Sequence, residues 1–103
     1  MEITVSGKHI EITDAIRQYA MEKAAKLPRY FDRVQAIHVL ADRSDSHGYL
    51  VEILVHVEHR DPFIARSHNE DLYACIDEVM DKMERQLTDH KEKLRNRKHP
   101  GAR

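Results

Sequence analysis

Several features that would define a chemistry are scarce in this sequence of 103 residues. Cys75 is the only cysteine, which excludes an intramolecular disulfide and any zinc site built on several cysteines. There is no tryptophan, and the few tyrosines and phenylalanines lack the aromatic pattern of proteins that stack single-stranded RNA on a sheet. No apolar run approaches the roughly 20 residues that cross a bilayer, and no signal segment follows Met1. We therefore expect an intracellular protein without a membrane partner, in which Cys75 is a small buried hydrophobe.

Motifs for catalysis and metal binding are also missing. The sequence has eight histidines, and the closest pair with metal-like spacing is His56 and His59. On an extended strand these two side chains do not converge on one face, and no third ligand stands at a suitable distance. No glycine-rich nucleotide loop and no nucleophile motif is present. We expect no metal, no cofactor, no small-molecule substrate and no enzymatic activity.

The net charge of −1 conceals an uneven distribution. Residues 1–33 carry +1, residues 34–81 carry −7, and residues 82–103 carry +5. A nearly neutral protein with a cationic end and an anionic middle can present a strong local potential on one face. The cationic end suits a polyanion, whereas the acidic middle suits a protein partner.

Local patterns predict four strands and two helices. Alternating apolar residues are typical of half-buried strands, and apolar residues at helical spacing are typical of amphipathic helices. Thr13 is a plausible N-cap for the first helix, and Pro28 should stop it after Leu27. The predicted elements are strands at 2–8, 35–41, 49–58 and from 63 onward, and helices at 14–27 and 71–97.

The order β-α-β-β-β-α indicates an α+β fold with a four-stranded sheet and two helices packed on one face. The second, third and fourth strands should be antiparallel. Residues 1–97 then form one domain, and residues 98–103 a flexible basic tail. The linker after the first helix should anchor itself on the core through Tyr30 and Phe31.

A helical wheel at about 100° per residue divides the second helix into an apolar, an acidic and a basic stripe. The acidic stripe holds Asp77, Asp81 and Glu84. The basic stripe, interrupted by Asp89, holds Lys82, Arg85, Gln86, Lys93, Asn96 and Arg97. Cations repeated along a helix can follow a phosphate backbone, because each neutralised phosphate releases counterions. A solvated face with ion pairs four residues apart has the same pattern, so this helix alone leaves both interpretations open.

Lys23 lies inside the apolar arc of the first helix, between Tyr19 and Leu27. Its aliphatic stem should cover the core while its ammonium emerges in the groove between the helices, although a simple escape to solvent also fits. In the groove it would join Lys26, Arg29 and Arg33, and the groove would then be cationic. We predict that the charged ends of Lys23, Lys26, Lys82, Arg85 and Lys93 lie on one continuous surface.

Several blocks resemble the bacterial hibernation-promoting factor and ribosome-associated inhibitor family, over nearly the whole chain. The blocks are Glu11–Arg17, Lys26-Leu27, Tyr30–Arg33, Asp71–Asp77, Asp81–Leu87 and His90–Leu94. The resemblance implies a fold similar to double-stranded-RNA-binding domains and a cytoplasmic protein that is not an enzyme. Such a protein would lay its helices on small-subunit ribosomal RNA near the decoding centre and block the messenger and transfer RNA sites. It would thereby inhibit translation on idle ribosomes, under stress or in stationary phase.

The resemblance also implies a set of RNA-facing positions. These are Lys23, Lys26, Arg33, Lys82, Arg85, Gln86, Lys91 and Lys93. They overlap the groove derived from the wheels, except that the wheel puts Lys91 at the far edge of the apolar arc. Asn69 stands where relatives commonly carry glycine before the last helix, and its tolerance of positive φ should preserve the turn.

The length implies the short subtype of the family, without a dimerisation domain or extended tail, and a monomer off the ribosome. A different interpretation stays open. Relatives have been described as modulators of a sigma factor, and the acidic segment 34–81 could present a docking face for a protein.

Overall fold

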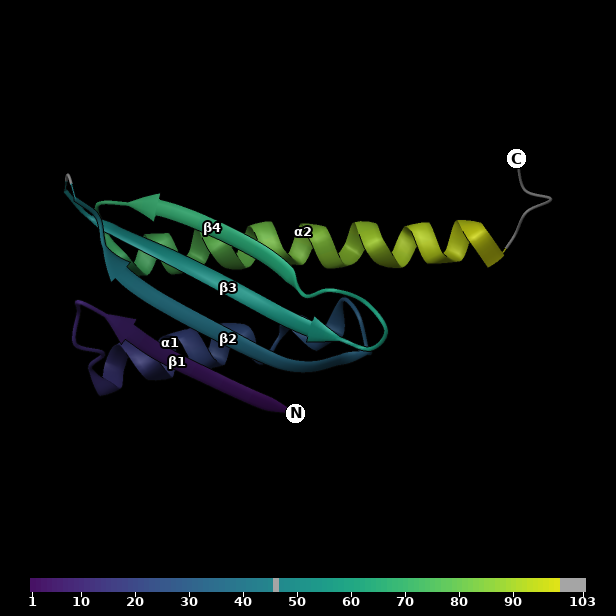
Figure 1. The fold of residues 1–103 in the computed structure, drawn as a ribbon, viewed down its shortest axis with the longest axis horizontal. Helices are drawn as coiled ribbons and strands as arrows, with labels where there is room; N and C mark the ends of the chain where they lie inside the picture. Colours follow the sequence, from purple (N-terminus) through teal and green to yellow (C-terminus); the bar gives the residue numbers. More distant parts are fainter. Residues whose placement is uncertain (46, 99–103) are drawn as a thin grey trace.

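The computed structural model describes residues 1–45 and 47–98, except for the side chains of residues 97 and 98. Its elements are β1 (Glu2–Lys8), α1 (Asp14–Ala24), the short 3-10 helix η1 (Leu27–Arg29), β2 (Val34–Arg43), β3 (Tyr49–Val57), β4 (Phe63–Asn69) and α2 (Leu72–Lys98) (Figure 1). This confirms the predicted α+β class and the β-α-β-β-β-α order. The proposed tail begins inside α2 at Lys98, and residues 99–103 lie outside the described part of the chain.

The four strands form one sheet in the order β1-β2-β3-β4. β1 pairs in parallel with β2, and α1 supplies the crossover that a parallel connection needs. The strands β2, β3 and β4 pair antiparallel, as predicted. α1 and α2 contact each other, and both lie against the same face of the sheet (Figure 1).

The core is the layer between the sheet and the helices. One row of the sheet aligns Val5, Val39, Ile53 and Ala65 across all four strands, and each of these residues is buried. α1 contributes small residues to the layer and α2 contributes large ones. The helix residues that are fully or almost fully buried are Ala20, Ala24, Cys75, Ile76, Val79, Met83 and Leu87. Cys75 is therefore a core residue, and burial raises the pKa of its thiol.

α1 is shorter than predicted, because it ends at Ala24 and not at Leu27. Pro28 acts earlier than expected, since a proline disfavours helical backbone in the residue before it and cannot donate to the preceding turn. The chain instead forms the 3-10 turn of η1, with Pro28 inside it. Two local predictions are confirmed. The Thr13 hydroxyl accepts from the Ile16 N–H at 3.2 Å, and Phe31 is buried.

The turn before α2 is kept by a mechanism other than the one predicted. Within the residues that the structure describes, positive φ occurs at His9, Gly48 and His59, so Asn69 does not adopt it. The Asn69 side chain instead accepts from the Asp71 N–H at 2.9 Å and donates to the carboxylate of Glu78. An asparagine side chain can close a turn in this way without left-handed backbone.

If Asn69 acts through its side chain, replacing it with glycine should destabilise the protein. Asn69→Gly is expected to lower the free energy of unfolding by about 1 kcal/mol, because it removes hydrogen bonds on both sides of the turn. Urea unfolding measures this change. Asn69→Ser is the matched control, since it keeps an oxygen acceptor for Asp71 and should lose less. A glycine variant as stable as the parent would show that backbone freedom matters here after all.

Candidate nucleic-acid interface

α2 buries its apolar stripe on the sheet and presents two flanks. One flank faces α1, and the other faces β4, the last strand of the sheet. The predicted RNA-binding side chains are distributed over both flanks.

The flank that faces α1 is acidic. The Lys23 ammonium lies 3.3 Å from a carboxylate oxygen of Asp77, and the Tyr19 hydroxyl donates to the same oxygen at 2.6 Å. The hydrogen bond to Asp77 raises the pKa of Tyr19 and the pKa of Lys23 above their ordinary values. Nearby, a hydrogen bond with Glu84 raises the pKa of Tyr30. The ammonium of Lys23 therefore emerges in the interhelical groove as predicted, but it meets an anion there.

The prediction of one continuous cationic surface across both helices is wrong. The wheel separated Asp77 from Lys82 correctly, but it could not tell which stripe would face α1. Packing turns Asp77 toward α1 and Lys82 toward β4, on opposite flanks of α2. Lys23 is consequently separated from the basic stripe by the helix itself.

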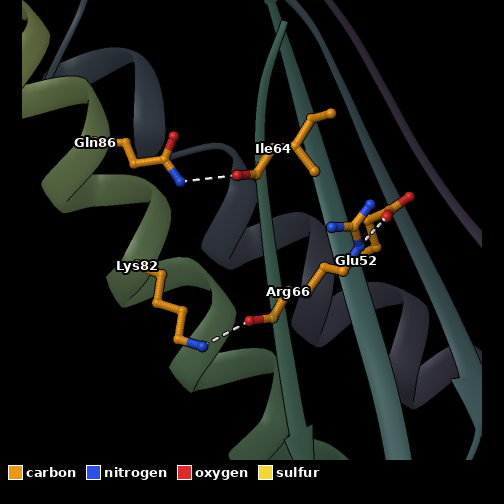
Figure 2. Close-up of polar contacts among 5 residues, drawn as sticks. All are labelled: Glu52, Ile64, Arg66, Lys82 and Gln86. Carbon is orange, nitrogen blue, oxygen red and sulfur yellow. Dashed lines mark hydrogen bonds and ion pairs between the residues drawn. The ribbon is translucent and has the colours of Figure 1, made fainter.

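The flank that faces β4 carries the basic stripe. The Lys82 ammonium donates to the carbonyl of Arg66 at 2.7 Å, and the Gln86 amide donates to the carbonyl of Ile64 at 2.8 Å (Figure 2). β4 is an edge strand, so these side chains cap backbone acceptors that would otherwise be open to another chain. Arg85 joins Lys82 and Gln86 around a shallow hollow of about 400 Å³ against β4.

Two further hollows extend this surface toward the C-terminal end of α2. The hollow of about 270 Å³ is lined by Arg60, Phe63, Gln86, Asp89, His90 and Lys93. The hollow of about 450 Å³ is lined by Phe31, Arg33, Glu58, His59, Arg60, Asp61, His90 and Leu94. Neighbouring hollows share Gln86 and then Arg60 and His90, so the three adjoin one another, and the surface that they make is here called the α2–β4 trough.

The trough brings together Arg33, Lys82, Arg85, Gln86 and Lys93, five of the nine predicted RNA-binding residues. The other predicted cations lie outside it. Lys26, Arg29 and Lys91 are exposed, whereas Lys23 is half-buried beside Asp77.

Sequence reasoning missed two arginines. Arg60 lines two of the hollows, with its guanidinium 3.8 Å from the centre of the Phe63 ring. Arg66 forms an ion pair with Glu52 at 2.6 Å across β3 and β4 (Figure 2). Both arginines lie in the acidic segment 34–81, where the local charge balance gave no reason to look for a cationic site.

Neither a metal site nor a membrane helix emerges from the described ranges. Across residues 1–45 and 47–98, no three His, Cys, Asp or Glu side chains are grouped so as to hold a metal ion. No helix in the same ranges has the length and apolar character needed to cross a membrane. His56 instead contacts the ring of His38, at 5.1 Å between centres.

Residues 3–95 match the family model described as Sigma 54 modulation protein / S30EA ribosomal protein. The chain is 38% identical over 93 residues to the ribosome hibernation promoting factor of Azotobacter vinelandii, covering 90% of this chain and 85% of the relative. It is 36% identical over 95 residues to the factor of the same name in Escherichia coli strain K12, covering 92% of this chain and 98% of the relative.

Two solved structures share the fold. A ribosomal subunit interface protein from Coxiella burnetii superposes with a TM-score of 0.77 at 25% identity, covering 89% of this chain and 99% of that one. The N-terminal domain of Thermus thermophilus Protein Y superposes with a TM-score of 0.77 at 33% identity, covering 87% of this chain and 99% of that one.

The contact between Tyr19 and Asp77 makes a titration prediction. Asp77→Ala should lower the pKa of Tyr19 toward its ordinary value of about 10. An NMR titration that follows the tyrosine ring signals against pH measures this change. In the parent protein the folded-state pKa lies above that of the unfolded chain. The stabilisation from this contact should therefore be complete below a pH of about 10 and decline as the pH rises through the folded-state pKa.

The matched control is Glu84→Ala, which should lower the pKa of Tyr30 and leave that of Tyr19 in place. An unchanged Tyr19 titration in Asp77→Ala would contradict the acidic character assigned to the interhelical groove.

Proposed function

The chain belongs to the family of sigma 54 modulation proteins and S30EA ribosomal proteins, and from this premise we propose how it acts. It is a ribosome-binding protein of ribosome hibernation and not an enzyme. We propose that it binds small-subunit ribosomal RNA near the decoding centre, in the cytoplasm and as a monomer when off the ribosome. By occupying the sites of messenger and transfer RNA, it would inhibit translation.

The observation that carries this proposal is the α2–β4 trough. Four of its cations, Arg33, Lys82, Arg85 and Lys93, make no ion pair within 4 Å among the residues that the structure describes. Lys82 and Lys93 stand 11 residues apart on one helix, which is about 16 Å along its axis. Unpaired cations spread over that length can contact several phosphates of a strand, and each contact adds affinity through counterion release.

The two flanks of α2 should contribute unequally. Lys82 donates to a neutral carbonyl and keeps its full charge, whereas Asp77 compensates the charge of Lys23. A phosphate that binds Lys23 must compete with Asp77 and is also repelled by it. We therefore assign the main RNA contacts to the trough and a smaller contribution to Lys23.

Inhibition through occupancy should saturate. Because the proposed action needs no chemical step, inhibition in a cell-free translation system should reach its limit at about one protein per ribosome. Titration of the protein at fixed ribosome concentration measures this ratio. Strong inhibition far below one protein per ribosome would instead require turnover and would contradict the proposal.

A second candidate is a protein-binding regulator such as a sigma-factor modulator, which the family description and the acidic flank of α2 favour. Salt separates the two functions. RNA binding through six to eight phosphate contacts should lose about a thousandfold or more in affinity between roughly 50 and 200 mM salt. A largely apolar protein interface should change far less over the same range.

The decisive variant is Lys82→Glu combined with Arg85→Glu. Both side chains are exposed on the trough, so the double reversal should abolish co-sedimentation with purified small subunits while the protein stays folded. Loss of the Lys82 hydrogen bond to β4 should cost about 1 kcal/mol or less. Each lost phosphate contact should also reduce the salt slope by roughly 0.7–0.9. The thermal midpoint of the same sample controls for folding.

The matched control is Lys8→Glu combined with Arg43→Glu. It makes the same change in net charge at two exposed positions on β1 and β2, away from the trough. This variant should sediment with small subunits nearly as the parent does. Equal loss of binding in both variants would show that the loss is due to net charge and not to the position of the cations. Normal binding of Lys82→Glu/Arg85→Glu would show that the trough is not part of the interface.

A further inference from the structure

The end of the α2–β4 trough near Arg33 differs from the rest of it. The loop between β3 and β4 lies beside the segment that leads from η1 into β2 (Figure 1). The hollow of about 450 Å³ is lined by residues of that loop, of that segment and of α2. Its aromatic wall is ordered by ring contacts. The His90 ring packs edge-on against Phe31 at 5.2 Å and against Phe63 at 5.1 Å, centre to centre.

Arg60 forms a flat surface on this wall. Its guanidinium lies 3.8 Å from the centre of the Phe63 ring, its Nε donates to the carbonyl of Asp61 at 2.9 Å, and its Nη1 is 3.4 Å from the His90 Nδ1. These contacts hold the planar group from one side. Arg60 is nevertheless exposed and lines both neighbouring hollows, so the group stays accessible.

The loop backbone positions this arginine. His59, the preceding residue, has a φ of 64°, in the left-handed region that a residue with a side chain seldom adopts. A left-handed residue reverses the chain sharply, and here it does so directly before Arg60. The sharp turn thereby places Arg60 over Phe63, where it lines both the hollow that holds Arg33 and the neighbouring hollow that holds Lys93.

The charges around Arg60 suit a ligand with separate anionic and hydrogen-donating parts. Arg33 lines the hollow and has no ion-pair partner within the described ranges, so it is available to an anion. Glu58 and Asp61 line the same hollow and can accept hydrogen bonds from amino groups. A ligand that is anionic at one end and flat at the other, with amino groups on the flat part, satisfies all of these groups.

We propose that this hollow binds one unstacked nucleotide of single-stranded RNA. The base stacks on the exposed face of the Arg60 guanidinium, as bases stack on arginine planes in RNA-binding proteins, and Arg33, which lines the same hollow, contacts the phosphate. A volume of about 450 Å³ lies in the range of small-ligand sites, about 300–1,000 Å³. Between the two pyrimidines, the carboxylates favour cytosine, which offers an amino group where uracil has a carbonyl.

The inference rests on the proposed function, because ribosomal RNA would supply the nucleotide, but its test needs no ribosome. Cytidine 5′-monophosphate, uridine 5′-monophosphate and inorganic phosphate are titrated separately into the full chain and followed by NMR. The cytidine nucleotide should shift signals of Arg33, Arg60, His90 and Phe63 saturably, and it should bind more tightly than the uridine nucleotide. Inorganic phosphate should shift Arg33 without moving Phe63.

The discriminating variant is Arg60→Lys, which keeps the charge and removes the plane. Its affinity for the cytidine nucleotide should fall at least about fivefold, since stacking on the plane is lost, while the response to inorganic phosphate stays. Arg43→Lys is the matched control. Arg43 also lies over an aromatic ring, 6.0 Å from the centre of Tyr49, but it is on β2 outside the trough, so both responses should persist.

Equal affinity of Arg60→Lys and the parent for the cytidine nucleotide would overturn the inference. So would shifts confined to other surfaces, or the absence of saturable shifts. None of these outcomes touches the sedimentation of the parent protein with small subunits, which tests the proposed function separately. Loss of sedimentation with intact nucleotide binding would in turn leave the hollow as a nucleotide site and remove its ribosomal role.

Discussion

The charged groups of this protein depend on one packing interaction, the burial of the apolar stripe of α2 against the sheet. Ile76, Met83 and Leu87 are at most 1% exposed, so the helix cannot rotate about its axis without losing the core. With this stripe held, the step of about 100° per residue directs Asp77 toward α1 and Lys82 toward β4. The positions of the ion pairs and free cations on α2, among its described side chains, follow from that orientation.

The same orientation lets the helices protect the edges of the sheet. Arg17 of α1 donates to the carbonyl of Val5 on β1 at 2.6 Å, and Lys82 and Gln86 of α2 donate to carbonyls of β4. Both edges of the four-stranded sheet therefore carry helix side chains on backbone acceptors, which discourages pairing with another chain. A neutral carbonyl leaves the charge of Lys82 uncompensated, so edge protection and phosphate binding are compatible in one residue. Lys23 does not combine these two roles, because its ammonium is paired with the carboxylate of Asp77.

Local chemistry explains both what could be predicted and what could not. The order of elements and the anchoring of Phe31 follow from hydrophobic periodicity, which is a property of neighbours in sequence. The predictions for the end of α1 and for the turn at Asn69 were wrong in detail. In each case two local conformations compete. Around Pro28 a 3-10 turn competes with a longer helix, and at Asn69 a side-chain hydrogen bond competes with left-handed backbone. Residue type alone does not choose between them.

By itself, the sequence determined the fold class, the family resemblance and the composition of each helical stripe, because residues three and four apart share a face of any helix. Only the tertiary structure decided which stripe meets which neighbour. Packing brought Asp77 to Lys23 and so removed the expected cationic groove. It also brought Arg60, from an acidic segment, beside Lys93. Such contacts join residues more than 30 positions apart, and they depend on how the apolar faces of several elements fit together at once, which no local pattern encodes.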